Sequence, residues 1–66
     1  MSIVKVIELI GEGKSIEDAM ESAVKEASQT IKDIHQVYLE HCYGVVENNK
    51  VTKYRVNIKV SFIVHH

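Results

Sequence analysis

The side chains best suited to hold a small ligand recur at every second position in two segments of the chain. They carry amide, phenol, carboxylate and cationic groups, so together they can donate hydrogen bonds, accept them and stack on a flat ring. Because alternate residues of a strand share one face, we expect them to form the polar face of a sheet. In an isolated subunit that face contacts water, whereas in a closed oligomer it can line a cavity or an intersubunit cleft. The set is Gln36, Tyr38, Glu40, Lys53, Arg55, Asn57 and Lys59.

Motifs of the common enzyme classes are missing from the sequence. It has no nucleophile elbow, phosphate-binding loop, dinucleotide fingerprint or paired-cysteine metal motif. His41 and Cys42 are adjacent, but neighbours on a strand point to opposite faces, so they cannot hold one metal ion together. We interpret His35 as a surface turn residue, and we expect Glu8 and Glu40 to form ion pairs with Lys or Arg on neighbouring strands. We therefore expect no catalytic residue, no metal site and a protein that is not an enzyme.

The composition favours a small protein that completes its core by self-association. The chain has 66 residues, one Cys, no Pro and a hydrophobic fraction of 45%. That length is enough for a single domain, residues 1–66, and a domain of this size buries only about 60% of the surface that its unfolded chain exposes. A small apolar chain without a disulfide usually buries the remaining surface in an oligomer.

Charge and hydropathy argue against several classes of partner. Lys and Arg number 8 and Asp and Glu number 9, so there is no excess of positive charge to attract nucleic acid. The longest apolar run is far shorter than the roughly 20 residues of a membrane span, and we expect no signal peptide. The lone Cys42 fits a reducing compartment. We expect a cytoplasmic protein that binds neither nucleic acid nor membranes.

Alternation of apolar and polar side chains predicts three strands. The pattern is longest and most regular over residues 51–64, VTKYRVNIKVSFIV. Residues 3–10 are mostly apolar on both faces, which is typical of a strand covered on both sides, and a loop is expected at 11–14. With one helix available, the second cover of this strand would come from another subunit. Residues 36–47 predict the third strand, with a tight hairpin turn over residues 47–50.

The strand at residues 36–47 alternates less cleanly than the other two. Its apolar face is predicted to carry Val37, Leu39, Tyr43 and Val45, with Cys42 on the other face. Gly44 weakens the strand and is a candidate bulge.

A helix is expected to begin after Ser15 and to continue to Ile34. Ser15 and Asp18 resemble a capping box, and Glu17 adds negative charge at the positive end of the helix dipole. Apolar residues then recur at spacings of three and four, so one side of the helix should pack on the sheet. Met20 is interpreted as part of this core. The stripe is Ile16, Ala19, Met20, Ala23, Val24, Ala27, Ile31 and Ile34.

The order of these elements predicts an α+β fold of the type βαββ. If the second and third strands form a hairpin, the first strand can add antiparallel to the free edge of the third. The result is a three-stranded antiparallel sheet in the order 2-3-1, packed around one helix. Residues 51–64 then form the central strand.

The chain resembles the dodecin family over essentially its whole length. The resemblance rests on three stretches, KVIELIG, SIEDAMESAVKEASQTIKDI and KYRVNIKVSFIV, together with the length and the βαββ order. It implies a small cytoplasmic protein of bacteria or archaea that assembles as a hollow homododecamer. It also implies flavin binding, of riboflavin or FMN, in clefts on two-fold axes, for storage rather than catalysis.

The resemblance also places a flavin site, and this sequence departs from it at two positions. The tryptophan of the family, which stacks on the flavin ring, falls on Gln36, and its ring-edge glutamine falls on Arg55. Tyr38, two residues along the same face, is the candidate replacement ring. Arg55 can stack through its guanidinium or pair with a phosphate or carboxylate; alternatively, it bridges to Glu40 or to a neighbouring subunit.

Two functions follow from this resemblance. The first is a dodecin-like dodecamer that binds flavin with weakened affinity, through Gln36, Tyr38 and Arg55. The second is a dodecin-like shell that no longer binds flavin and either binds another solute or a metal ion, or serves only as an assembly.

Overall fold

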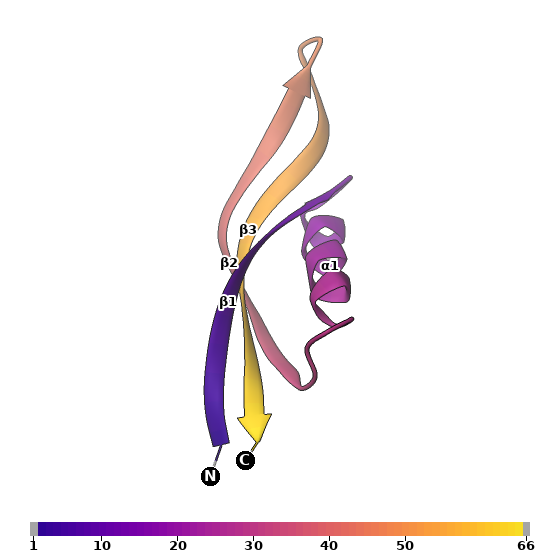
Figure 1. Ribbon diagram of the computed structural model, residues 1–66. Coiled ribbons are helices and arrows are strands. Elements are labelled where there is room, and N and C mark those ends of the chain that lie inside the picture. Colours follow the sequence, from indigo (N-terminus) through magenta and orange to yellow (C-terminus); the bar gives the residue numbers. More distant parts are fainter. Residues whose placement is uncertain (1, 66) are drawn as a thin grey trace.

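Three long strands and one helix follow each other in the order that the sequence predicts (Figure 1). The computed structural model describes residues 2–65, and Met1 and His66, which the predicted domain 1–66 includes, lie outside the described residues. The βαββ order is confirmed. The elements are β1 (Ser2–Gly13), α1 (Ile16–Ala27), β2 (Ile34–Glu47) and β3 (Lys50–His65).

The strand β3 is the centre of the sheet. The strand order is β1-β3-β2, and β3 pairs antiparallel with both neighbours, as predicted. The pairing with β1 runs without interruption from Ser2 opposite His65 to Gly13 opposite Tyr54. A strand of 16 residues thus has hydrogen-bonding neighbours on both edges.

The hairpin between β2 and β3 closes through two asparagines, which confirms the predicted tight turn. Glu47 pairs with Lys50, and the two residues between them adopt the left-handed conformation, with φ of 52° at Asn48 and 63° at Asn49. A two-residue turn of this kind needs positive φ at both central positions because its twist must match that of the strands. Asparagine tolerates this conformation better than most residues with a side chain.

The helix α1 begins where the sequence predicts. Ser15 is its N-cap, and the Ser15 hydroxyl accepts a hydrogen bond of 3.0 Å from the backbone N–H of Asp18. Glu17 and Asp18 lie in the first turn, where the helix dipole favours negative charge.

The predicted end of the helix is wrong, because α1 ends at Ala27 rather than Ile34. The Ser28 hydroxyl donates to the carbonyl oxygen of Lys25 at 2.7 Å, and Thr30 N–H bonds back three residues to Ala27, which tightens the last turn. Ile34 instead opens β2 opposite Phe62. No helical segment in residues 2–65 has the length and apolarity that a bilayer crossing needs.

The predicted loop at residues 11–14 is also wrong over its first three residues, which continue β1. Gly11 and Gly13 lie on the sheet face beneath α1, opposite Val56 and Tyr54. A Cβ on Gly11 would overlap the carbonyl oxygen of Ala19, and a Cβ on Gly13 would lie 2.6 Å from the Ala19 nitrogen. These glycines therefore permit the helix backbone to approach β1 closely.

The core is a thin layer between α1 and one face of the sheet. Two helix alanines, Ala19 and Ala23, pack on three β-branched residues of β3, namely Val56, Ile58 and Val60. The helix contacts β1 and β3 extensively and β2 only slightly. Much apolar surface stays exposed in the single chain. It includes Ile3, Val4, Val6, Ile10, Tyr38, Tyr43, Val46 and Val51.

We predict that Gly11→Ala destabilises the fold by about 1–3 kcal/mol, because the added methyl must displace helix backbone. Urea unfolding followed by circular dichroism at a fixed protomer concentration measures this change. Gly44→Ala is the matched control, since its Cβ would lie 3.0 Å from Cγ1 of Val51, which belongs to an exposed side chain and not to helix backbone. Equal losses in the two variants would contradict the role given to the helix contact.

Candidate functional site

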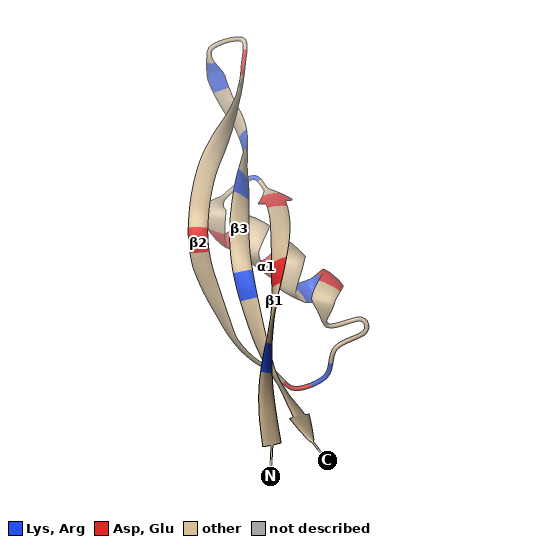
Figure 2. Cartoon of the chain, turned by 60° about the vertical axis from the view of Figure 1, so that its left-hand side comes forward, with Lys and Arg blue, Asp and Glu red and all other residues tan. Residues whose placement is uncertain are grey.

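The sheet face turned away from α1 carries the predicted ligand-binding side chains, and we call it the open face. Residues directly opposite each other in an antiparallel sheet share a face. Lys59 thus shares the open face with Glu8 of β1 and Tyr38 of β2. Figure 2 shows acidic and basic segments side by side on the three strands. Further members are Val4, Val6, Ile10, Glu12, Gln36, His41, Tyr43, Lys53, Arg55, Asn57 and Ser61.

A bulge at Glu40 corrects the predicted faces of β2. Leu39 pairs with Ile58 and His41 pairs with Asn57, so Glu40 is an extra residue. One extra residue moves every later side chain of the strand to the other face. Tyr43 therefore lies on the open face rather than beside Leu39, where the alternation placed it.

Other residues beyond the bulge change faces in the same way. Val45 lies opposite Lys53 on the open face, and Cys42 lies opposite Val56 on the helix side, which reverses both predictions. Gly44 pairs regularly with Tyr54, so the predicted bulge at Gly44 is also wrong. The nearby register shift lies in β3, between Lys53, the partner of Val45, and Val51, the partner of Val46.

Gln36 and Tyr38 lie together at one end of the open face. They line a hollow of about 190 Å³ with Val6, Lys59 and Ser61. Tyr38 is 61% exposed, so its ring is available to a ligand. The hollow is smaller than the roughly 300–1,000 Å³ of an ordinary ligand pocket. One copy of the chain therefore encloses too little space here for a complete ligand pocket.

Arg55 does not join this hollow. It lies opposite Tyr43 and six positions along β3 from Ser61, which at about 3.3 Å per residue is roughly 20 Å. Its guanidinium carbon is 6.0 Å from the centre of the Tyr43 ring, within reach of a cation–π interaction. The three predicted site residues thus belong to two separate places on the open face.

Glu12 is the carboxylate partner of Arg55. Arg55 Nε donates to Glu12 Oε2 at 2.7 Å, Arg55 Nη2 pairs with the same oxygen, and Lys53 Nζ lies 3.5 Å from Glu12 Oε1. The alternative in which Arg55 bridges to Glu40 is therefore wrong. The hydrogen bond from Arg55 lowers the pKa of Glu12, with smaller contributions from the charges of Arg55 and Lys53 against an opposing desolvation. The same bond raises the pKa of Arg55.

Lys59 forms the cross-strand ion pairs that the sequence predicts for Glu8 and Glu40. Its Nζ lies 4.0 Å from Glu8 Oε1 and 3.4 Å from Glu40 Oε2. The side chains of Lys59 and Glu8 are well exposed, and exposed pairs add little to stability. Their effect is to hold the ammonium group at the rim of the hollow with Gln36 and Tyr38.

Asn57 carries a side-chain acceptor that no donor in the described part of the chain satisfies. Its Oδ1 is buried and has no hydrogen-bond partner in residues 2–65. Asn57 also lines a shallow hollow of about 440 Å³ with Glu8, Leu9 and Ile10 at the edge of β1. A buried acceptor is normally paired, so a donor from outside this chain would be stabilising here.

Metal-ligating side chains do not converge in the described part of the chain. Within residues 2–65 no group of three or more His, Cys, Asp and Glu side chains lies close enough to hold a metal ion.

Comparison with known proteins agrees with this architecture. A family model described as Dodecin matches residues 3–65. No curated protein matches the chain closely enough to count as a relative.

Several solved structures share the fold. A mutant of the Thermus thermophilus dodecin superposes with a TM-score of 0.93 at 22% identity, over 100% of both chains. The dodecin from Streptomyces davaonensis gives 0.92 at 18% identity, over 98% of this chain and 97% of that one. The dodecin from Streptomyces coelicolor gives 0.92 at 24% identity, over 98% of this chain and 94% of that one. Because the family model spans nearly all of the chain, this protein belongs to the dodecin family.

Proposed function

We propose that this protein is a cytoplasmic homododecamer that binds and stores flavin, riboflavin or FMN, in clefts between subunits. Each copy contributes one dodecin-like domain, residues 1–66. Gln36 and Tyr38 would contact the ligand together, and Arg55 would contact a ligand from its separate position on the open face. Binding needs no catalytic group, so the proposal does not include an enzyme activity.

The incomplete hollow on the open face carries this proposal. It combines an exposed aromatic ring at Tyr38 with a hydroxyl, an amide and the ammonium group of Lys59. A flat heteroaromatic ligand gains most from that combination of a ring face and directional polar groups. The second wall has to come from another copy, which fits a protein that leaves Val4, Val6 and Ile10 exposed on the same face.

Affinity should be lower than in a site with tryptophan. Gln36 stands at the family's tryptophan position and offers no ring to stack on. An aromatic pair is worth about 0.5–1.5 kcal/mol beyond the area that it buries. Tyr38 supplies a smaller ring, and Arg55 is already paired with Glu12.

A second candidate is a dodecin-like shell that has lost flavin and holds another solute or ion, or serves as an assembly only. The pairing of Arg55 with Glu12 favours it, because that guanidinium would have to leave a carboxylate before it could bind a ligand.

The assembly is tested first. We expect light scattering of the purified protein at micromolar concentration to give about 90 kDa, twelve times the 7.5 kDa of one chain. The physical reason is the apolar surface that a single copy leaves exposed. A mass of one chain at that concentration would disprove both candidate functions.

Flavin binding is tested by titration of riboflavin, and separately of FMN, with the protein while flavin fluorescence is followed. We expect quenching with a dissociation constant in the micromolar range or weaker, since only Tyr38 is available to stack. An unquenched signal from a correctly assembled dodecamer would favour the second candidate.

The substitution Gln36→Trp should raise flavin affinity tenfold or more, because it restores a large ring beside the hollow. Gln29→Trp is the matched control, since Gln29 is exposed beyond the end of α1 and the open face stays unchanged. Equal affinities in the two variants would mean that the hollow at Gln36 is not the flavin site.

A further inference from the structure

The hollow that contains Tyr38 has more negative than positive charge at its rim. Lys59 is its one charged lining residue, and Lys59 Nζ lies 3.4 Å from Glu40 Oε2 and 4.0 Å from Glu8 Oε1. Two carboxylates therefore share one ammonium group, and one negative charge is left in excess. The other lining residues add no formal charge: they are Val6, Gln36, Tyr38 and Ser61.

Both carboxylates lie close enough to act on a ligand held in this hollow. Glu8 and Tyr38 lie opposite Lys59 on its two sides, so one row across the sheet contains all three. At about 4.8 Å between neighbouring strands, Glu8 is roughly 10 Å from Tyr38, which is close to the Debye length at physiological salt. The side chain of Glu8 is 69% exposed, so its carboxylate is open to a ligand. A charged group anywhere in the hollow therefore experiences the excess negative charge.

The opposite excess lies at the other end of the open face. There Arg55 and Lys53 share the single carboxylate of Glu12. Arg55 lies roughly 20 Å along β3 from the hollow, about twice the Debye length, so its charge is largely screened there. The open face is thus divided into a negative end with an exposed ring and a positive end.

We propose that this division makes the site selective for riboflavin over FMN, and that Glu8 and Glu40 are its specificity-determining residues. The two ligands share the ring and the ribityl chain, and FMN adds a phosphate with close to two negative charges. A phosphate that approached Lys59 would have to displace a carboxylate and would still lie beside both Glu8 and Glu40, and like charges repel. Ribityl hydroxyls, by contrast, can donate hydrogen bonds to these carboxylates. The inference rests on the proposed function and specifies which of its two ligands the site takes.

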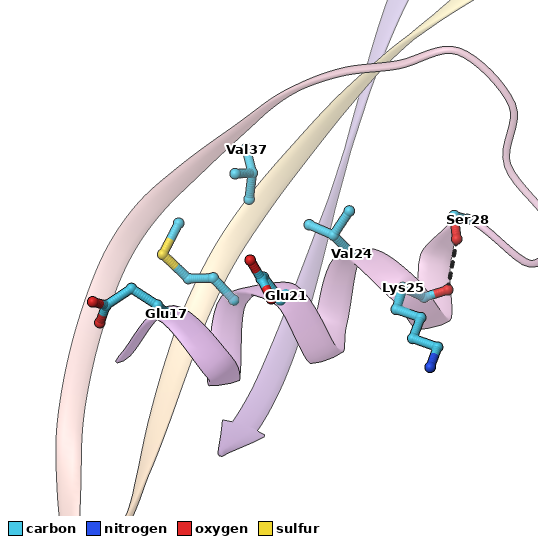
Figure 3. A pocket seen from close by; sticks show the side chains of 7 residues that line it. Glu17, Glu21, Val24, Lys25, Ser28 and Val37 are labelled. Atoms are coloured by element: carbon cyan, nitrogen blue, oxygen red, sulfur yellow. Dashed lines mark hydrogen bonds between the residues drawn. The ribbon is translucent and has the colours of Figure 1, made fainter. Parts of the chain in front are cut away.

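The helix side of the sheet provides a matched position for a control. An apolar groove of about 620 Å³ runs there between α1 and β2, because α1 contacts β2 only slightly (Figure 3). Glu17, Glu21 and Lys25 line it, so it carries the same set of charges as the hollow. Its other lining residues, which include no aromatic ring, are Met20, Val24, Ser28 and Val37. Glu21→Gln therefore removes one carboxylate from the chain without changing the open face.

Parallel titrations of riboflavin and FMN, followed by flavin fluorescence, measure the preference. At about pH 8, where the phosphate carries nearly two negative charges, and at about 0.1 M salt, we expect riboflavin to bind at least about threefold more tightly. At about 1 M salt the Debye length falls to about 3 Å, so the ratio of the two dissociation constants should approach one.

Substitutions assign the preference to its residues. Glu8→Gln and Glu40→Gln should each lower the ratio at low salt about twofold or more by strengthening FMN binding, because Gln keeps the size of the side chain and removes its charge. Riboflavin affinity should change less than FMN affinity in both variants. Glu21→Gln should leave the ratio as it is in the unchanged protein.

The outcomes separate the selectivity from flavin binding itself. Equal affinities for the two ligands at low salt, or a preference for FMN, would overturn the selectivity and leave the proposed flavin function standing. A shift in Glu21→Gln as large as that in Glu8→Gln would also overturn it, because net charge alone would then explain the ratio. Quenching of neither ligand by a correctly assembled protein would refute both.

Discussion

The close approach of α1 to β1 is the constraint on which the rest of this structure depends. Two glycines on the strand, Gly11 and Gly13, and small alanines on the helix permit that approach. With 12 residues the helix can cover only part of one sheet face. It lies over β1 and β3, and within residues 2–65 no other element covers the groove along β2, the protruding hairpin or the open face.

The sequence predicts elements well where a single physical signal dominates. Period-two alternation identified β3, and the capping residue Ser15 identified the start of α1, because both are local properties. The end of the helix depends on a non-local fact, that Ile34 has to pair with Phe62. Periodicity cannot show this, since Ile31 and Ile34 continue the helical spacing by coincidence. Gly11 and Gly13 are predicted to form a loop for a similar reason. Their role is to permit close contact with a helix, and amino-acid composition does not show which residues contact each other.

The candidate site was predicted only in part, and the bulge at Glu40 explains why. Gln36 and Tyr38 precede the bulge, so simple alternation placed them correctly beside Lys59. Tyr43 follows it, and the same rule put its ring on the wrong face. No glycine or proline stands at or beside Glu40, so the sequence contains no local signal for the extra residue. The partner of Arg55 was likewise missed, because Glu12 was assigned to a loop rather than to the strand beside β3.

The two uncovered sides of the sheet differ in chemistry, although both expose apolar side chains to a second copy. On the helix side, the exposed groups are aliphatic side chains with a few charges at the rim, which suits a permanent contact between copies. On the open face, ion pairs and an aromatic ring alternate with apolar residues, and the pairs are exposed enough to exchange for a ligand. Changes at positions 36 and 55 therefore alter the open face alone. Under the proposed function, side chains at these two positions could therefore change the affinity for a ligand while the helix side of the sheet keeps its packing.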